Sequence, residues 1–89
     1  DEMKTTAEIL MEASRHIGGA IAREYGWHDS MGIADAIAKV CPDNPEGACA
    51  AFQALHEASG AVDLRAWQSG QTNYQIAAFM RDVARRRAQ

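Results

Sequence analysis

The side chains best suited to hold a metal or to catalyse a reaction are two cysteines and three histidines. Cys41 and Cys49 are separated by seven residues, and His16, His28 and His56 are far apart in the sequence. Structural zinc sites pair their ligands more closely, as in Cys-x₂₋₄-Cys or His-x₃₋₅-His. A disulfide between the cysteines would need an oxidising compartment. We therefore expect no metal and no other cofactor, and cysteines that stay reduced.

The sequence carries none of the common catalytic motifs. A nucleophilic cysteine needs a base beside it, and no known local signature surrounds either cysteine. There is no glycine-rich phosphate loop, no His-Glu-x-x-His and no nucleophile elbow. Glu8 and Glu12 are one helical turn apart, on a face that we expect to be solvated. We interpret the chain as a non-enzyme, and a cysteine-dependent enzyme is the most distant alternative.

Charge is divided unevenly along the chain, whose net charge is −3. Residues 1–64 hold eleven acids and four bases, whereas residues 65–89 hold five arginines and one acid. The acidic body disfavours sequence-independent nucleic-acid binding, which needs many phosphate contacts. Residues 45–57, the recognition helix of any helix-turn-helix here, contain no lysine or arginine. We expect a protein rather than a nucleic acid as the partner.

Two aromatic-loop residues and three arginines are the candidate contact residues. Trp27 and His28 follow a predicted helix end, where a large aromatic side chain either fills the core or anchors a partner. Arg81, Arg85 and Arg86 lie in the last predicted helix, where they either contact a partner or complement the helix dipole. We predict that these five residues bind the partner.

Helices must position these side chains. Thr5 and Glu8 have capping-box spacing, and apolar residues recur every three or four positions up to Tyr25. The first helix should therefore cover about residues 6–25, with Gly26 placed to end it. Two adjacent glycines at positions 18 and 19 indicate close approach of another helix, or else a kink.

The second helix should begin at Asp29 or Ser30 and end before Pro42, which cannot donate a backbone hydrogen bond. Asn44 and Pro45 have the order of an N-cap followed by proline at the first helical position. They predict a third helix that runs to about residue 59. The positions expected to face inward on these two helices are Ile33, Ile37, Val40, Ala48, Ala51, Phe52, Leu55 and Ala58.

A fourth helix should cover about residues 73–86, because Thr72 and Gln75 have capping-box spacing and an apolar stripe follows. Before it, residues 61–64 either pair weakly as a strand or make a short helical turn leading to Trp67, which should fill the core. The sequence thus predicts an all-α fold, a compact bundle of about four helices with short loops. It should form a single domain over residues 1–89, with residues 1–4 disordered or derived from cloning.

Two short motifs at fixed places in this helical pattern resemble a known family. Gly26-Trp27 follows the first predicted helix, and Ala66-Trp67-Gln68 with Gly70-Gln71-Thr72 precedes the last one. The chain is similar in these respects to a family of small uncharacterised bacterial and phage-encoded helical proteins, classed as a domain of unknown function. That family tends to carry Asn and Arg where this chain has Gln68 and Gln71. The resemblance implies a fold and no particular activity.

These observations favour a non-catalytic interaction protein that binds another protein, such as a phage-type effector or inhibitor of a host protein. The alternative is a nucleic-acid-associated regulator that uses the C-terminal arginines. A homodimer is compatible with both, because a chain this short gains core by association. No apolar stretch is long enough to span a membrane and no signal peptide is visible, so we expect a cytoplasmic protein without a membrane partner.

Overall fold

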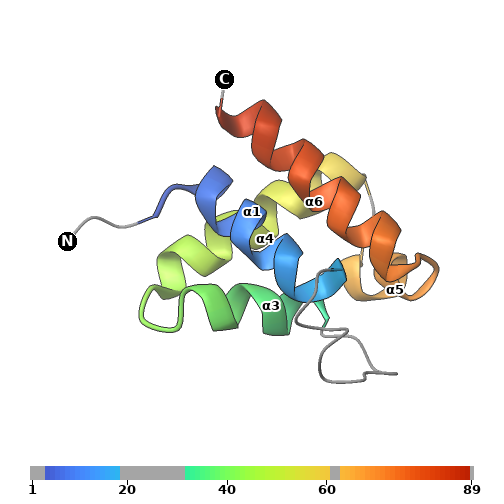
Figure 1. Cartoon of the computed structure of the whole chain (residues 1–89), viewed down its shortest axis with the longest axis horizontal. Helices are drawn as coiled ribbons and strands as arrows, with labels where there is room; N and C mark the ends of the chain where they lie inside the picture. The colour runs from blue at the N-terminus through green and yellow to red at the C-terminus, as the bar shows by residue number, and fades with distance from the viewer. Residues whose placement is uncertain (1–3, 19–31, 61–62, 89) are drawn as a thin grey trace.

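The computed structural model describes residues 4–18, 32–60 and 63–88. These residues form five helices and no strand (Figure 1). The helices are α1 (Thr6–Gly18), α3 (Ile33–Val40), α4 (Pro45–Ser59), α5 (Leu64–Ser69) and α6 (Asn73–Ala88). The predicted all-α bundle is confirmed, and the short helix α5 adds one element to the four that the sequence predicted.

Helix α1 is the element around which the core is assembled. It packs against α6, α3 and α4, and its largest interface is with α6 (Figure 1). Its inward side chains are Ile9, Leu10, Ala13 and Ile17, each at most 1% exposed. The facing side of α6 includes the buried Ala77 and Ala84, whose small side chains let the two helices approach closely. No helix of the described segments is long and apolar enough to cross a membrane.

Both predicted capping boxes are present. The Thr5 hydroxyl oxygen accepts a hydrogen bond from the Glu8 amide at 3.1 Å, and the Glu8 carboxylate accepts one from the Thr5 amide at 2.8 Å. Thr72 and Gln75 make the same reciprocal pair at 3.1 and 2.9 Å. Each box satisfies two backbone donors that would otherwise lack partners, so local sequence fixes the starts of α1 and α6.

Helix α4 has the boundaries that the sequence predicted. Asn44 Oδ1 accepts a hydrogen bond from the Gly47 amide at 3.0 Å, with Pro45 at the first helical position. The Asn44 side chain folds so closely over Gly47 that a Cβ there would lie 2.3 Å from Asn44 Nδ2. Gly60 ends the helix in the left-handed conformation, with φ of 69°.

The start of α3 corrects one expectation. The sequence placed it at Asp29 or Ser30, but the helix begins at Ile33, and Gly32 before it has an extended backbone with ψ of 169°. The Ile33 amide donates a hydrogen bond to Gln68 of α5, so a distant side chain caps this helix in place of the expected local one. A capping partner 35 residues away leaves no local signal in the sequence.

Smaller differences concern helix ends and faces. Helix α6 continues to Ala88, two residues beyond its predicted end. Ala58 was expected to face inward and is exposed, because Ala51, Ala54 and Leu55 already supply the buried stripe of α4. The predictions for the first helix beyond Gly18, for the second glycine of the pair and for Gly26 lie outside the described residues.

Trp67 covers the edge of the core and does not fill it. Its side chain is half-buried, and its ring centroid lies 4.7 Å from that of Phe79 at an interplanar angle of 48°. The fully inward position on α5 belongs to Leu64, which is 7% exposed. The two aromatic rings join α5 to α6, with a geometry in the range favoured by aromatic pairs.

Candidate functional site

The predicted contact residues fall into two groups. Trp27 and His28 lie outside the described residues, whereas the three arginines lie on α6. Arg81 Nε donates a hydrogen bond to Ser14 Oγ at 3.1 Å, and this fully buried hydroxyl donates in turn to the Met11 carbonyl at 2.7 Å. Arg81 therefore ties α6 to α1, in addition to any contact that it makes with a partner.

The arginines at the end of α6 all have acidic neighbours. Arg86 lies 2.6 Å from Asp82 in the i, i+4 pair that the sequence indicated, and Arg85 lies 4.0 Å from the same carboxylate. Arg87 reaches Glu57 on α4 at 3.4 Å. These side chains are 47–68% exposed, and ion pairs of this kind contribute only about 0–1 kcal/mol. The pairs are weak enough for the arginines to exchange partners.

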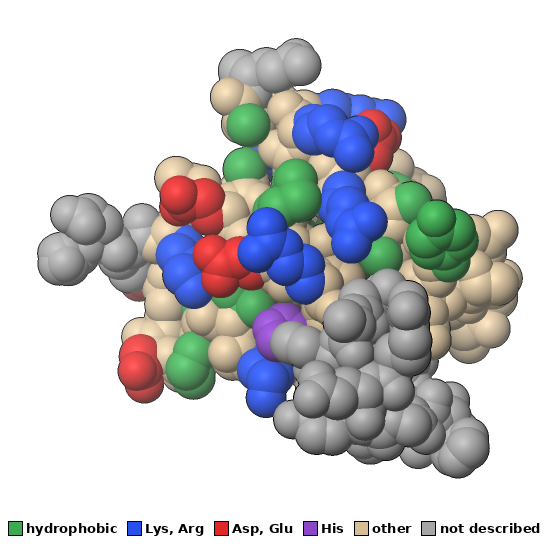
Figure 2. Space-filling view, in the orientation of Figure 1, with side chains coloured by type: hydrophobic (Ala, Val, Ile, Leu, Met, Phe, Trp, Pro, Cys, Tyr) green, Lys and Arg blue, Asp and Glu red, His purple; other side chains and the backbone are tan. Residues whose placement is uncertain are grey.

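Basic side chains gather on one face of the bundle. Figure 2 shows Lys and Arg side chains spread over α1 and α6, with fewer acids between them. On α1, Arg15 is exposed, and no carboxylate of the described segments pairs with it. The basic character that the sequence located in the C-terminal segment thus extends onto α1.

The two cysteines are free thiols in different environments. Cys41 is buried, its thiol donates to the Ile37 carbonyl at 3.1 Å, and burial raises the pKa of the thiol despite the opposing charge of Lys4. Cys49 is exposed on α4. Within residues 4–18, 32–60 and 63–88, no three His, Cys, Asp or Glu side chains come close enough together to hold a metal ion.

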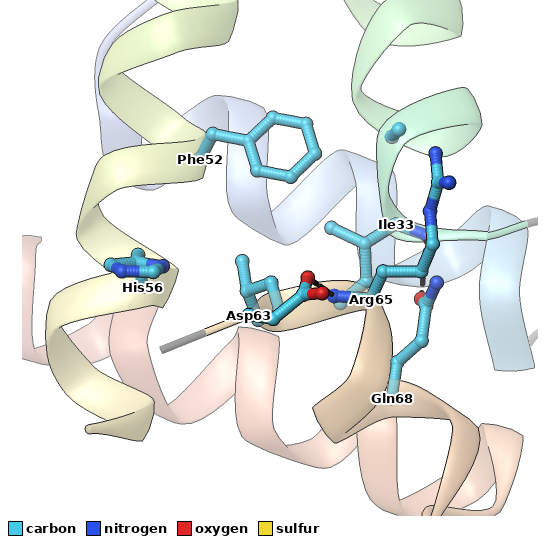
Figure 3. Close-up of a pocket in the computed structure, with 8 residues that line it drawn as sticks. Ile33, Phe52, His56, Asp63, Arg65 and Gln68 are labelled. Atoms are coloured by element: carbon cyan, nitrogen blue, oxygen red, sulfur yellow. Dashed lines mark hydrogen bonds between the residues drawn. The ribbon is translucent and has the colours of Figure 1, made fainter. Parts of the chain in front are cut away.

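A pocket of about 400 Å³ lies where α3, α4 and α5 meet. It is called the α4–α5 pocket below, and it is lined by Ile33, Ala34, Phe52, His56, Asp63, Leu64, Arg65 and Gln68. Figure 3 shows the Phe52 ring pointing from α4 across the pocket toward Ile33 and Arg65. Phe52 is half-buried against the core, while His56, one turn further along α4, is exposed. The pocket therefore combines an apolar base with a polar rim.

Two side chains of the rim, Asp63 and Gln68, have structural roles. Asp63 Oδ1 accepts a hydrogen bond from the Arg65 amide at 3.0 Å and so caps the start of α5. Gln68 Oε1 accepts the bond from the Ile33 amide at 3.1 Å (Figure 3). The Gln68 bond links α5 to α3, whereas the Asp63 bond is local to the start of α5.

The Arg65 guanidinium on the rim, like the His56 imidazole, forms no hydrogen bond or ion pair within the described segments. Arg65 is exposed, and its side chain runs along the wall of the pocket toward α3 (Figure 3). No carboxylate or carbonyl of the described segments pairs with its guanidinium. A guanidinium offers five N–H donors, so this wall presents unused hydrogen-bonding capacity to a ligand.

A second, shallower depression lies on the other side of the same two α4 side chains. This α4 hollow has a volume of about 490 Å³ and is lined by Ala48, Cys49, Phe52, Gln53, His56 and Glu57. Phe52 and His56 therefore form a ridge between the pocket and the hollow. The two depressions are thus neighbours along α4 that share these two side chains.

Sequence reasoning did not find this surface. It assigned Phe52 to the core and gave no role to Arg65, because each residue is ordinary within its own helix. The recess forms where α5 lies beside α3 and α4. The Gln68–Ile33 hydrogen bond that links α5 to α3 joins residues far apart in the sequence. The one local signal is Asp63, whose place two residues before Arg65 is that of a helix N-cap.

The comparisons with known proteins add no identification. No family model matches the chain, and no curated protein or solved structure matches it significantly.

Proposed function

We propose that this protein is a non-catalytic interaction protein that binds another protein through the α4–α5 pocket and the adjoining α4 hollow. The observation that carries the proposal is Phe52, a half-buried aromatic side chain that forms a wall of both depressions. Protein interfaces concentrate their binding energy in apolar recesses with a polar rim, where a few aromatic and arginine side chains dominate. Phe52 with Arg65 on the opposite wall has this composition.

The chemistry of the cysteines supports a binding role over a catalytic one. A reactive cysteine needs a lowered thiol pKa and an accessible sulfur. Cys41 has the opposite properties, since it is buried and its pKa is raised. Cys49 is accessible and lies in the hollow, where its small side chain serves as contact surface. A phage-type effector or inhibitor that binds a host protein in the cytoplasm fits this proposal, as does the family resemblance.

The proposal is tested by affinity capture from an extract of the native host with matched variants. Phe52→Gln removes the shared aromatic wall, and Gln53→Arg alters the hollow without touching the core. Tyr74→Gln is the control, because Tyr74 is an aromatic residue that is 78% exposed and lies in neither depression. We expect at least one protein that the wild type and Tyr74→Gln retain and the two α4 variants lose. Equal retention by all four proteins would contradict the proposal.

A second candidate function, a nucleic-acid-associated regulator, is favoured by the basic face over α1 and α6 (Figure 2). If Arg85, Arg86 and Arg87 contact phosphates, binding should fall with salt at a log–log slope of roughly −2 to −4. We expect no binding to DNA or RNA at physiological salt, because the acidic body repels the flanking duplex. Sub-micromolar binding that is lost when the three arginines become glutamine would favour this second function.

A further inference from the structure

We infer that this protein associates with a second copy of itself in a head-to-tail contact between oppositely charged surfaces. The basic face over α1 and α6 of one copy would lie against the acidic side of the next. The acidic side consists of Asp35 on α3, Asp43 in the turn after it and Glu46 at the start of α4. None of these acids lines the α4–α5 pocket or the α4 hollow, so the inference is independent of the proposed function.

The charges of the described segments divide into two parts of opposite sign. Residues 4–18 and 73–88, which include α1 and α6, carry six lysines and arginines against three acids, a surplus of +3. Residues 32–60 and 63–72, which include α3, α4 and α5, carry two lysines and arginines against five acids, a surplus of −3. Helices α6 and α3 pack on opposite sides of α1 (Figure 1). Each copy therefore presents both halves of an electrostatically complementary contact.

Three arginines of the basic face have no carboxylate of their own. Arg81 donates its hydrogen bond to a neutral hydroxyl of α1, and Arg15 has no ion-pair partner in the described segments. Arg85 lies 4.0 Å from Asp82, a carboxylate that Arg86 approaches more closely, at 2.6 Å. The positive surplus of this face is therefore not neutralised within the copy.

The three acids of the acidic side are likewise unpaired. Asp35, Asp43 and Glu46 are exposed, and none of them forms an ion pair with another described residue. Lys39 lies near them on α3, and its single charge leaves a net charge of −2 for the four residues. An arginine of another copy can approach these carboxylates without displacing a partner that they already have.

A contact of this kind should be weak and sensitive to salt. Ion pairs between exposed side chains contribute little individually, so we expect association at protein concentrations of about 0.1–1 mM. Dissolved ions screen such charges, so the association should weaken as salt is added. Because different surfaces of the two copies meet, the contact is heterologous and can continue beyond a dimer.

The test is sedimentation equilibrium of the purified chain at about 25 mM and about 300 mM salt. The apparent mass should rise with protein concentration at low salt and approach that of the monomer at high salt. Arg85→Glu and Lys39→Glu are matched variants, because each lowers the net charge by two, from −3 to −5. Arg85→Glu should raise the dissociation constant about three- to tenfold, whereas Lys39→Glu, which adds charge beside the acidic side, should leave it unchanged or lower it. Arg15→Glu repeats the test on α1, and circular dichroism verifies that each variant is folded.

A mixing experiment identifies the two surfaces. Asp43→Lys should weaken self-association as Arg85→Glu does, and a mixture of the two variants should associate like the wild type, because each supplies the surface that the other has lost. Their net charges, −1 and −5, are both negative, so attraction between net charges does not explain such a recovery. The inference is overturned if the wild type is monomeric at about 1 mM in low salt, if Lys39→Glu weakens association as much as Arg85→Glu, or if the mixture does not associate.

Discussion

Gln68 joins α5 to α3, two helices of the site that are far apart in the sequence, so its substitution tests how the site is held together. Its Oε1 accepts the hydrogen bond of the Ile33 amide, and the capping residue Gly32 offers no side chain for that purpose. In Gln68→Ala this half-buried donor loses its partner, and α3 loses its link to α5. We predict lower stability and faster hydrogen exchange at the Ile33 amide.

The size of the effect can be worked out from the contact. Losing a helix N-cap side chain typically costs about 1 kcal/mol, within a range of roughly 0.5–2 kcal/mol. For a chain of 89 residues, 1 kcal/mol corresponds to a fall in Tm of about 5 °C, since the entropy of unfolding is roughly 2.1 cal/mol/K per residue. Urea unfolding followed by circular dichroism gives the first quantity, and a thermal scan gives the second.

A conservative variant makes the reasoning testable in both directions. Gln68→Glu keeps an oxygen acceptor and places a negative charge at the α3 N-terminus, where the helix dipole contributes about 0.3–1 kcal/mol of stabilisation. We therefore expect Gln68→Glu to be at least as stable as the wild type. If Gln68→Ala unfolds like the wild type, or if Gln68→Glu is as unstable as Gln68→Ala, the capping account is wrong.

Three further predictions concern packing and protonation, each checked by urea unfolding. Trp67→Ala should cost about 2–3 kcal/mol, less than the roughly 3–5 kcal/mol of a fully buried ring, because Trp67 is half-buried against Phe79; a cost near zero would contradict the packing. Gly47→Ala should destabilise by about 1 kcal/mol, because its Cβ would displace the Asn44 cap; a gain in stability, which alanine normally brings to a helix, would show that the cap tolerates it. Burial raises the pKa of Cys41, so the folded state holds this proton more tightly than the unfolded state does. This stabilisation of the folded state is fully present at pH values below the pKa of the unfolded thiol, and it is lost as the pH rises through the raised pKa of the folded one. The free energy of unfolding should therefore fall more for the wild type than for Cys41→Ala between about pH 7 and about pH 10.

Local signals in the sequence were sufficient for much of the fold. The Thr5–Glu8 and Thr72–Gln75 boxes set the starts of α1 and α6, and the Asn44 cap sets that of α4. Each device acts within four residues, so its spacing can be recognised without knowledge of the fold. Apolar periodicity then identified the inward faces of the helices. Ala58 is the exception, because the spacing of small residues in a stripe does not show which of them lie at its edge.

The candidate site depends on contacts that spacing does not reveal. Helix α3 starts where Gln68 reaches it, and the recess beside Phe52 depends on where α5 settles. Arg65 stands out only by comparison, since the arginines at the end of α6 all form ion pairs and its guanidinium forms none within the described segments. The predicted roles of Arg81, Arg85 and Arg86 in partner binding stay predictions.

The central claim, that a protein partner occupies the recess along α4, is tested most directly by photocrosslinking in the native host. A benzophenone amino acid replaces Gln53, which is exposed in the α4 hollow, and in a matched variant it replaces Ala78, which is exposed on α6. We predict one discrete crosslinked protein from position 53 that is absent from position 78. A protein other than this chain crosslinked from position 78 and not from position 53 would contradict the account.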